Sequence, residues 1–386
     1  MIRRALFWTS AFAVVFAYVG APLVIFARAL LRPRTIAARR IEPPVSIVIA
    51  ARNEEASIGE RLDNLASLDY PDDCLQVIVA SDGSDDATVA IASTRASERV
   101  TVLDLERVGK ADALNEAVSR ATGEIVVFTD ANTAFAPDAV RALVAPFADP
   151  GVGGVAGNQV YTKDGRSAGE AGERSYWDFD RFLKRAESAA GSTVSATGAI
   201  YALRRELVPT IVAGVTDDFF TSTAVIDRGY RLAFAPDAIA YEPPASSANR
   251  EYGRKVRIIT RGFRGVATRR ALLDPRRTGF YALQLAWHKL LRRLMAVPLI
   301  VIGLTSLTLL ASPFYRLAAA FQALAYGAAA IGLVAPRSRI GRSKPVVLAA
   351  YFVMVNVASL HAAINVLRGK RIERWEPTRS TDKDVT

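Results

Sequence analysis

The chain has 386 residues, of which 51% are hydrophobic, and a formal net charge of +11. This apolar content is high for a soluble protein and indicates that part of the chain lies in a membrane. The basic residues cluster beside apolar segments, which favours membrane lipids over nucleic acid as their partner. The single cysteine, Cys74, excludes an intramolecular disulfide and a cysteine-based zinc site. We therefore predict a membrane protein with no nucleic-acid partner.

The first apolar segment runs from Ala5 to Ala27 without a charged residue. As a helix it would be about 34 Å long, enough to cross a hydrocarbon core of about 30 Å. A signal peptide is the alternative because Arg3 and Arg4 precede the segment, but the apolar part of a signal peptide is only about 7–15 residues long. We therefore predict an N-terminal transmembrane anchor over residues 1–31.

Arginines are more numerous after this anchor than before it. Those that follow are Arg28, Arg32, Arg34, Arg39 and Arg40. Because basic residues remain on the cytoplasmic side, we predict an integral protein of the inner membrane whose polar domain, after the anchor, is cytoplasmic.

The C-terminal part holds three more apolar segments: Leu294–Ser312, Leu317–Ala335 and Val346–Leu367. They predict about three transmembrane helices over residues 294–367, with a basic polar tail over 368–386. Residues 276–293 precede them and resemble an interfacial amphipathic helix, for which a short linker helix is the alternative. Counting these spans places the basic tail outside, against the rule used above, which suggests that one span does not cross fully.

Between these regions, residues 41–275 alternate between strand-like and helical patterns. The apolar runs of strand length are Val45–Ala50, Leu75–Ala80, Val100–Leu103 and Glu124–Thr129, and the helical patterns between them are Ala56–Leu68, Ala87–Ala96 and Lys110–Ala121. Strands that are apolar on both faces predict a Rossmann-like α/β domain with a mostly parallel sheet. Ligands of such sheets bind beyond the carboxyl ends of the strands.

Polar residues follow three of these strands. The segments are Arg52-Asn53-Glu54, Ser81-Asp82-Gly83-Ser84-Asp85-Asp86 and Asp130-Ala131-Asn132. None has the glycine-rich turn of a dinucleotide fold or the lysine of a P-loop. Gly83 allows a tight turn, and Asp85 is a candidate cap of the next helix. The two oxygen-bearing side chains of Asp130 and Asn132 suit a divalent cation that bridges phosphates.

In this order, and together with Gly109-Lys110-Ala111-Asp112-Ala113-Leu114-Asn115, these motifs resemble family 2 glycosyltransferases of the GT-A fold. The resemblance covers roughly residues 45–290 and extends to enzymes that make cellulose, hyaluronan or poly-N-acetylglucosamine. It implies a nucleotide-sugar donor, preferably a UDP-sugar, and Mg²⁺ or Mn²⁺ as cofactor. The donor-site residues that it implies are Arg52, Glu54, Asp82, Ser84, Lys110 and Asp130, with Asp130 and Asn132 at the metal.

The acceptor side is implied by Thr216-Asp217-Asp218, which resembles the Thr-Glu-Asp motif of inverting family members. By this resemblance, Asp218 is the catalytic base that deprotonates the acceptor hydroxyl. The alternative for Asp218 is a helix N-cap, because a helical pattern follows. Asp217 and Gly198 are assigned to the acceptor side, and a simple turn is the equal alternative for Gly198.

An aromatic segment, Tyr176-Trp177-Asp178-Phe179 with Phe182, lies on a helical pattern. It fits either a sugar-facing platform or a buried core, and we favour the core.

Two departures from the family pattern narrow the prediction. Processive members carry Gln-x-x-Arg-Trp where this chain has Arg254-Lys255-Val256-Arg257-Ile258, so Arg257 keeps the implied diphosphate contact while the aromatic support is lost. Asn132 stands where many relatives have a second Asp, which lowers the expected metal affinity.

We therefore predict an inverting, non-processive glycosyltransferase with a lipid-linked or saccharide acceptor, in cell-envelope polysaccharide or glycolipid synthesis. The alternatives are a processive polysaccharide synthase and a catalytically inactive partner of another synthase.

Overall fold

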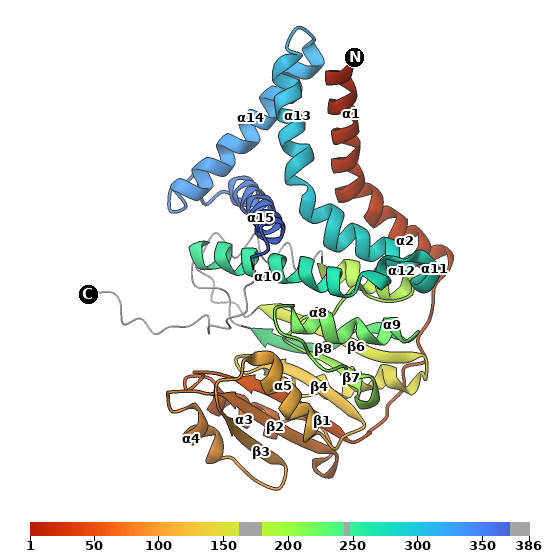
Figure 1. Cartoon of the computed structure of the whole chain (residues 1–386), viewed down its shortest axis with the longest axis vertical. Coiled ribbons are helices and arrows are strands. Elements are labelled where there is room, and N and C mark those ends of the chain that lie inside the picture. The colour runs from red at the N-terminus through yellow and green to blue at the C-terminus, as the bar shows by residue number, and fades with distance from the viewer. Residues whose placement is uncertain (162–179, 243–247, 371–386) are drawn as a thin grey trace, which may run out of the picture.

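The computed structural model describes residues 1–161, 180–242 and 248–370. Figure 1 shows an α/β domain at one end of the molecule and a group of long helices at the other. The helical end combines the N-terminal segment with the C-terminal third of the described chain. One long helix, α10 (Ala248–Thr268), lies between the two parts.

The described residues form one eight-stranded sheet with the order β3-β2-β1-β4-β7-β6-β8-β5. The strands are β1 (Val45–Ala51), β2 (Leu75–Asp82), β3 (Val100–Leu105), β4 (Ile125–Asp130), β5 (Ala134–Phe135), β6 (Val152–Tyr161), β7 (Tyr201–Arg204) and β8 (Arg231–Glu242). From β3 to β4 all neighbours are parallel, whereas β7 runs antiparallel to β4 and β6. The first half of the sheet is thus a parallel βαβ series, and the second half is mixed.

Strand β1 is buried along its whole length, because helices cover both faces of the sheet. On one face, Ile47 and Ile49 pack with α3 (Ile58–Ala66) and α6 (Ala139–Val144). On the other face, Val48 packs with α5 (Lys110–Ser119), α8 (Asp217–Ser222) and α9 (Ala224–Asp227). Each fully buried aliphatic side chain contributes about 1.5–3 kcal/mol, so this double-sided core fixes the carboxyl ends of the strands.

The predicted α/β domain with a mostly parallel sheet is confirmed. Its four predicted strands are present with boundaries that differ by no more than two residues. The three helical patterns between them correspond to α3, α4 (Thr88–Ser93) and α5. The predicted cap of α4 at Asp85 is wrong: the N-cap is Ala87, and the side chain that accepts the N–H of Thr88 is that of Asp86. The N–H of Asp85 bonds to Asn53.

Three described helices are long and apolar enough to cross a membrane. They are the continuous N-terminal helix Ile2–Leu31, which comprises α1 (Ile2–Val15), the π-helical turn Phe16–Gly20 and α2 (Ala21–Leu31), and then α14 (Pro313–Val334) and α15 (Lys344–Leu367). The helix at the predicted segment Leu294–Ser312 is shorter: α13 (Ala296–Thr308) follows the helical segment Phe280–Leu294 after a bend of 47°. Phe280–Leu294 and Ala296–Thr308 are long and apolar enough for a span only when the two bent segments are taken as one helix.

Residues 276–293 pack against both parts of the molecule. They contain α11 (Pro275–Thr278), α12 (Phe280–Leu285) and the π-helical turn Ala286–Leu291. The hydroxyl of Tyr281 donates to the Val194 carbonyl, and the indole of Trp287 donates to the Ala17 carbonyl, both at 2.8 Å. An interfacial position for this segment remains a prediction.

Helix α15 packs across α10 (Figure 1). Figure 1 shows α15 strongly foreshortened beside α10, crossing the direction of α1 and α13. The Nζ of Lys255 lies 5.8 Å from the ring centroid of Tyr351, and the Tyr252 hydroxyl lies 3.0 Å from Nδ1 of His361. At the far end, the guanidinium of Arg264 donates to the Gly369 carbonyl at 3.2 Å.

The preference for a buried aromatic segment is wrong for Phe182, whose relative exposure is 58%. Its ring contacts Phe26 of α2, with centroids 4.6 Å apart, so it packs on the N-terminal helix instead of in the domain core. Residues Tyr176–Phe179 lie outside the described residues.

Candidate functional site

The loops after β1 and β2 hold each other in place. Asn53 adopts a positive φ of 52°, its backbone N–H donates to the Ser84 hydroxyl, and its side-chain oxygen accepts the N–H of Asp85. The N–H of Glu54 donates to the Thr88 hydroxyl at 2.8 Å. These bonds place Glu54 beside the sheet edge, where it lines a large cavity.

Asp82, at the end of β2, is buried and organises the next loop. Its Oδ1 accepts the backbone N–H groups of Val108 and Gly109, at 2.8 and 2.7 Å, and its carbonyl accepts a bond from Arg52 at 2.9 Å. Asp82 therefore fixes the turn that leads into α5. The same turn presents Lys110, the first residue of that helix.

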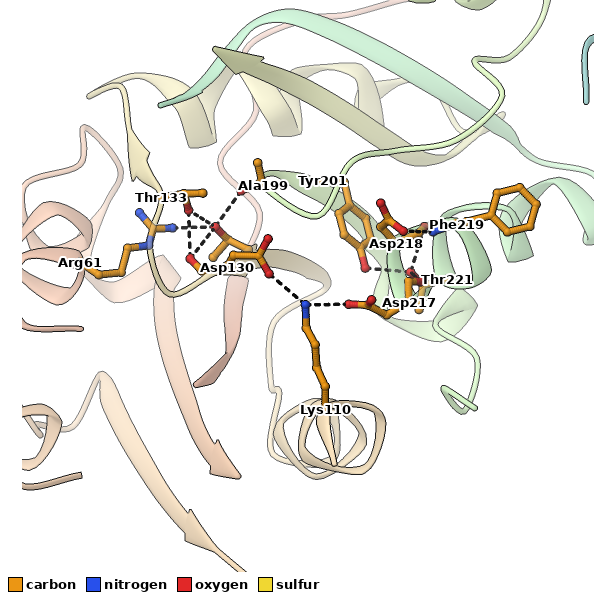
Figure 2. Close-up of polar contacts among 11 residues, drawn as sticks. Arg61, Lys110, Asp130, Thr133, Ala199, Tyr201, Asp217, Asp218, Phe219 and Thr221 are labelled. Atoms are coloured by element: carbon orange, nitrogen blue, oxygen red, sulfur yellow. Dashed lines mark hydrogen bonds and ion pairs between the residues drawn. The ribbon is translucent and has the colours of Figure 1, made fainter. Parts of the chain in front are cut away.

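The ammonium of Lys110 bridges two carboxylates from different parts of the chain. It lies 2.9 Å from Oδ1 of Asp130, at the end of β4, and 3.1 Å from Oδ2 of Asp217, the first residue of α8. Figure 2 shows Lys110 reaching between the two acids. The predicted donor and acceptor sides thus meet at one lysine.

This bridge shifts the pKa values of Lys110 and Asp217. Burial alone would lower the pKa of Lys110, but Asp130 and Asp217 more than offset it and raise that pKa. Burial would likewise raise the pKa of Asp217, but the charge and hydrogen bond of Lys110 hold it below its ordinary value. The site therefore holds a charged Lys110 beside a charged Asp217 at neutral pH.

Asp218 has a different environment, although it is the next residue. Burial and the charge of Asp217 raise the pKa of Asp218 to about 6, and its Oδ1 accepts the N–H of Phe219 at 2.7 Å. The helix begins at Asp217 with Thr216 as its N-cap, so Asp218 is not the cap. A carboxylate whose pKa lies near the working pH suits a general base.

Gly198 allows a close approach to Asp130. A Cβ at Gly198 would lie 3.1 Å from Oδ2 of Asp130, tighter than ordinary van der Waals contact. Its φ is not positive, so a left-handed turn is not the reason for glycine here. The contact places Gly198 beside the donor-side acid Asp130.

Sequence reasoning missed Arg61, which supports β4 from behind. Its guanidinium donates to the Thr129 hydroxyl at 2.9 Å and lies 4.1 Å from the Phe135 ring centroid. Burial lowers its pKa to about 9, and the charge of Asp130 partly offsets this. Arg61 occupies an inward position of α3, between Ile58 and Leu65, and a charge at such a position was the available signal.

A cavity of about 1340 Å³ contains most of the predicted site residues. Those that line it are Glu54, Lys110, Asp130, Asn132, Gly198, Asp217, Asp218 and Arg257. Arg52, Asp82 and Ser84 do not line it and instead hold the loops that do. Arg261 and Lys289 line the cavity as well, and sequence reasoning did not select them.

Asp130 and Asn132 are suited to a cation only together with a ligand. The described residues contain no group of three or more His, Cys, Asp or Glu side chains that could hold a metal by themselves. Mg²⁺ is commonly bound through one or two carboxylates plus substrate phosphates. The two residues therefore fit a metal that binds with a diphosphate.

The sequence profile of glycosyl transferase family 2 matches residues 46–212. Poly-beta-1,6-N-acetyl-D-glucosamine synthase of Staphylococcus epidermidis is 28% identical over 204 residues, covering 52% of this chain and 48% of the relative. The Staphylococcus aureus (strain COL) synthase of the same name is 27% identical over 204 residues, covering 51% and 49%. The chain thus spans about half the length of the curated relatives it matches.

Among solved structures, a mannosyltransferase from Pyrobaculum calidifontis in complex with GDP-Man and Mn²⁺ matches with a TM-score of 0.70 and 27% identity. The match covers 95% of this chain and 100% of that chain, so it includes the helices as well as the sheet. Residues 46–212 therefore form a glycosyltransferase family 2 domain, and the chain has the GT-A fold.

Proposed function

We propose that this chain is an inverting glycosyltransferase that moves one sugar from a UDP-sugar to a membrane-proximal or lipid-linked acceptor. The reaction would take place at the cytoplasmic face of the inner membrane, in envelope polysaccharide or glycolipid synthesis. The observation that carries the proposal is the Lys110 bridge, which joins the donor-side Asp130 to Asp217. Asp218, the neighbouring acid with a pKa of about 6, lines the same cavity.

On the donor side, Glu54 would contact the base or ribose and Arg257 the diphosphate, while Asp82 would hold the turn that presents Lys110. Asp130 and Asn132 would hold Mg²⁺ or Mn²⁺ together with that diphosphate, and the cation would offset the charge that builds on the leaving group. Lys110 holds Asp130 and Asp217 in position. The mannosyltransferase neighbour was solved with GDP-Man, so the UDP preference needs a direct test.

On the acceptor side, Asp218 would take the proton from the acceptor hydroxyl as its oxygen attacks the anomeric carbon. The nucleotide diphosphate leaves from the opposite side of that carbon, so its configuration inverts. A positioned general base contributes about 10²–10⁴-fold to a rate. We assign this contribution to Asp218.

The test is a panel of UDP- and GDP-sugars offered to the protein in nanodiscs, with Mg²⁺ and Mn²⁺ titrated separately and nucleotide release measured. We expect one UDP-sugar to be turned over in a metal-dependent way, and Asp218→Asn to lower kcat by about 10²–10⁴-fold. No release from any donor with either metal would refute the enzyme and favour the inactive-partner alternative.

The length of the product distinguishes a processive synthase from a single-transfer enzyme. A single-transfer enzyme adds one labelled sugar however long the reaction runs, whereas a synthase gives a ladder of products. The loss of the Gln and Trp of the processive motif at Arg254–Ile258 supports single transfer.

A further inference from the structure

The site cavity continues from the acids into the helical part of the molecule. Its wall includes Asp130 and Asp218 at one end and residues of α1, α13, α14 and α15 at the other. The helix residues that line it include Val14, Ile302, Ala318, Phe321, Ala325 and Phe352. One continuous space therefore connects the proposed reaction centre with helices that can lie in a membrane.

The membrane end of this cavity is suited to hydrocarbon. Most of its lining side chains are aliphatic or phenyl groups, and two of the polar ones, Asn356 and Ser359, donate to helix backbone. The Asn356 amide donates to the Phe352 carbonyl at 2.9 Å, and the Ser359 hydroxyl donates to the Val355 carbonyl at 2.8 Å. A sugar chain here would lose water without finding enough hydrogen-bond partners, whereas an acyl or prenyl chain loses nothing.

Positive charge gathers where the two ends of the cavity meet. Lys289, Arg292 and Arg293, in consecutive turns before α13, all line it. The Nζ of Lys289 lies 5.5 Å from the Phe219 ring centroid, next to Asp218 in the chain. A Cβ at Gly262 of α10 would overlap the guanidinium of Arg293, so the arginine packs directly on that helix.

The acidic side chains near this cluster belong to the catalytic domain: Asp180 and Asp218 line the same cavity and act on the charge of Lys289. Residues 1–41 and 275–372 contain no aspartate or glutamate, so carboxylates can come only from the catalytic domain or from the tail beyond residue 372. Three cations at the mouth of an apolar space complement one anionic group attached to a hydrocarbon chain. A phosphate-bearing lipid has this combination.

We propose that the cavity binds a phosphate-bearing lipid acceptor, with its phosphate at Lys289, Arg292 and Arg293 and its chain between α1, α13, α14 and α15. The headgroup then presents a hydroxyl to Asp218. This inference rests on the proposed function and specifies the acceptor class.

The binding test uses phosphatidic acid with a diazirine in one acyl chain, in phosphatidylcholine nanodiscs, without any donor. We expect saturable photolabelling of peptides from α13 and α14. Diacylglycerol with the same diazirine chain should label them several-fold less, because it lacks the phosphate. In Lys289→Gln/Arg292→Gln, the preference for phosphatidic acid should disappear.

Neighbouring residues on α14 supply matched controls. Ala325 and Ala318 line the cavity, whereas Leu324 and Leu317 are 77% and 72% exposed on the same helix. Ala325→Trp and Ala318→Trp fill the space and should each reduce labelling about tenfold, equivalent to about 1.4 kcal/mol. Leu324→Trp and Leu317→Trp add the same side chain outside the cavity and should label like the unmodified protein.

Equal labelling by both lipids, or undiminished labelling in both Ala325→Trp and Ala318→Trp, would overturn the lipid site. This result would leave the enzymatic proposal intact, because labelling needs no turnover. A protein that labels as expected but releases no nucleotide from any donor would instead refute the proposed function.

Discussion

At the residue scale, the pKa of about 6 at Asp218 predicts the pH dependence of the reaction. A base accepts a proton only when it is deprotonated, so the active fraction falls as the pH drops through this pKa. We expect kcat/KM, which reports on the free enzyme, to fall about tenfold per pH unit below about pH 6 and to level off above it. Initial rates of nucleotide release at low donor concentration would measure this profile.

Asp217→Asn provides the matched comparison for that profile. Because the Asp217 charge is one cause of the raised pKa of Asp218, removing it should move the acidic limb of the profile to lower pH. The assignment of the base to Asp218 fails if the limb stays in place in Asp217→Asn and persists in the residual activity of Asp218→Asn.

Lys110 predicts a pH-dependent loss of stability. In Lys110→Met, Asp217 loses the cation that stabilises its charged form, so its pKa in the folded protein rises. The folded protein is therefore destabilised at pH values above that raised pKa. The loss of stability shrinks as the pH falls and Asp217 is protonated. We expect a loss of about 2 kcal/mol at pH 8, less than for a fully buried pair because all three side chains are partly exposed.

Thermal unfolding in detergent at about pH 8 and about pH 5 would measure this difference. Arg120→Met on the same helix is the control, because its pair with Glu116 is exposed and contributes little. Equal losses for Lys110→Met at both pH values would contradict the bridge as the cause.

At the element scale, the interlocked loops after β1 and β2 depend on the backbone of Asn53. Its positive φ is costly for alanine but not for glycine, and both replacements lose the bond from the Asp85 N–H. We expect stability to fall by about 1 kcal/mol in Asn53→Gly and about 2 kcal/mol in Asn53→Ala.

The donor KM should rise in the same order, because Glu54 follows directly in the chain. Unfolding curves and donor titrations of the two variants would measure both effects. An alanine variant as stable as the glycine variant would show that the backbone conformation at Asn53 is not what holds the loops.

The parallel half of the sheet was predictable because its strands are apolar on both faces and its helices fill the intervals between them. The antiparallel half was not, since β7 has only four residues, Tyr201–Arg204, and pairs with segments far away in the chain. The order of the motifs predicted Lys110, Asp130 and Asp217 as site residues. It did not predict that Lys110 contacts both acids, because this contact forms only when α5 and α8 pack on the same face of the sheet.

At the scale of the whole molecule, the packing of α15 bears on which side of the membrane the C-terminal tail occupies. This helix is about 36 Å long, yet contacts from Tyr351 to Gly369 keep it beside α10 of the catalytic domain. A helix that crossed the membrane would leave α10 after its first turns. Length and apolar composition mark α15 as a possible span, but its packing places it along the domain surface.

We therefore expect Lys370, just beyond α15, to lie on the same side of the membrane as the catalytic domain. In a Cys74→Ser background, Lys370→Cys and Glu98→Cys should react together with an impermeant maleimide in inside-out vesicles. Leu310→Cys, in the turn between α13 and α14, should react only in right-side-out vesicles, because that turn lies at the far end of the helices from the sheet (Figure 1).

If α15 crossed the membrane, Lys370→Cys would be labelled in the same vesicles as Leu310→Cys. The basic residues Arg368 and Lys370 would then lie on the side of the membrane that the positive-inside rule disfavours. The packing of α15 on α10 favours the first result, since crossing would require breaking the Arg264 contact with Gly369.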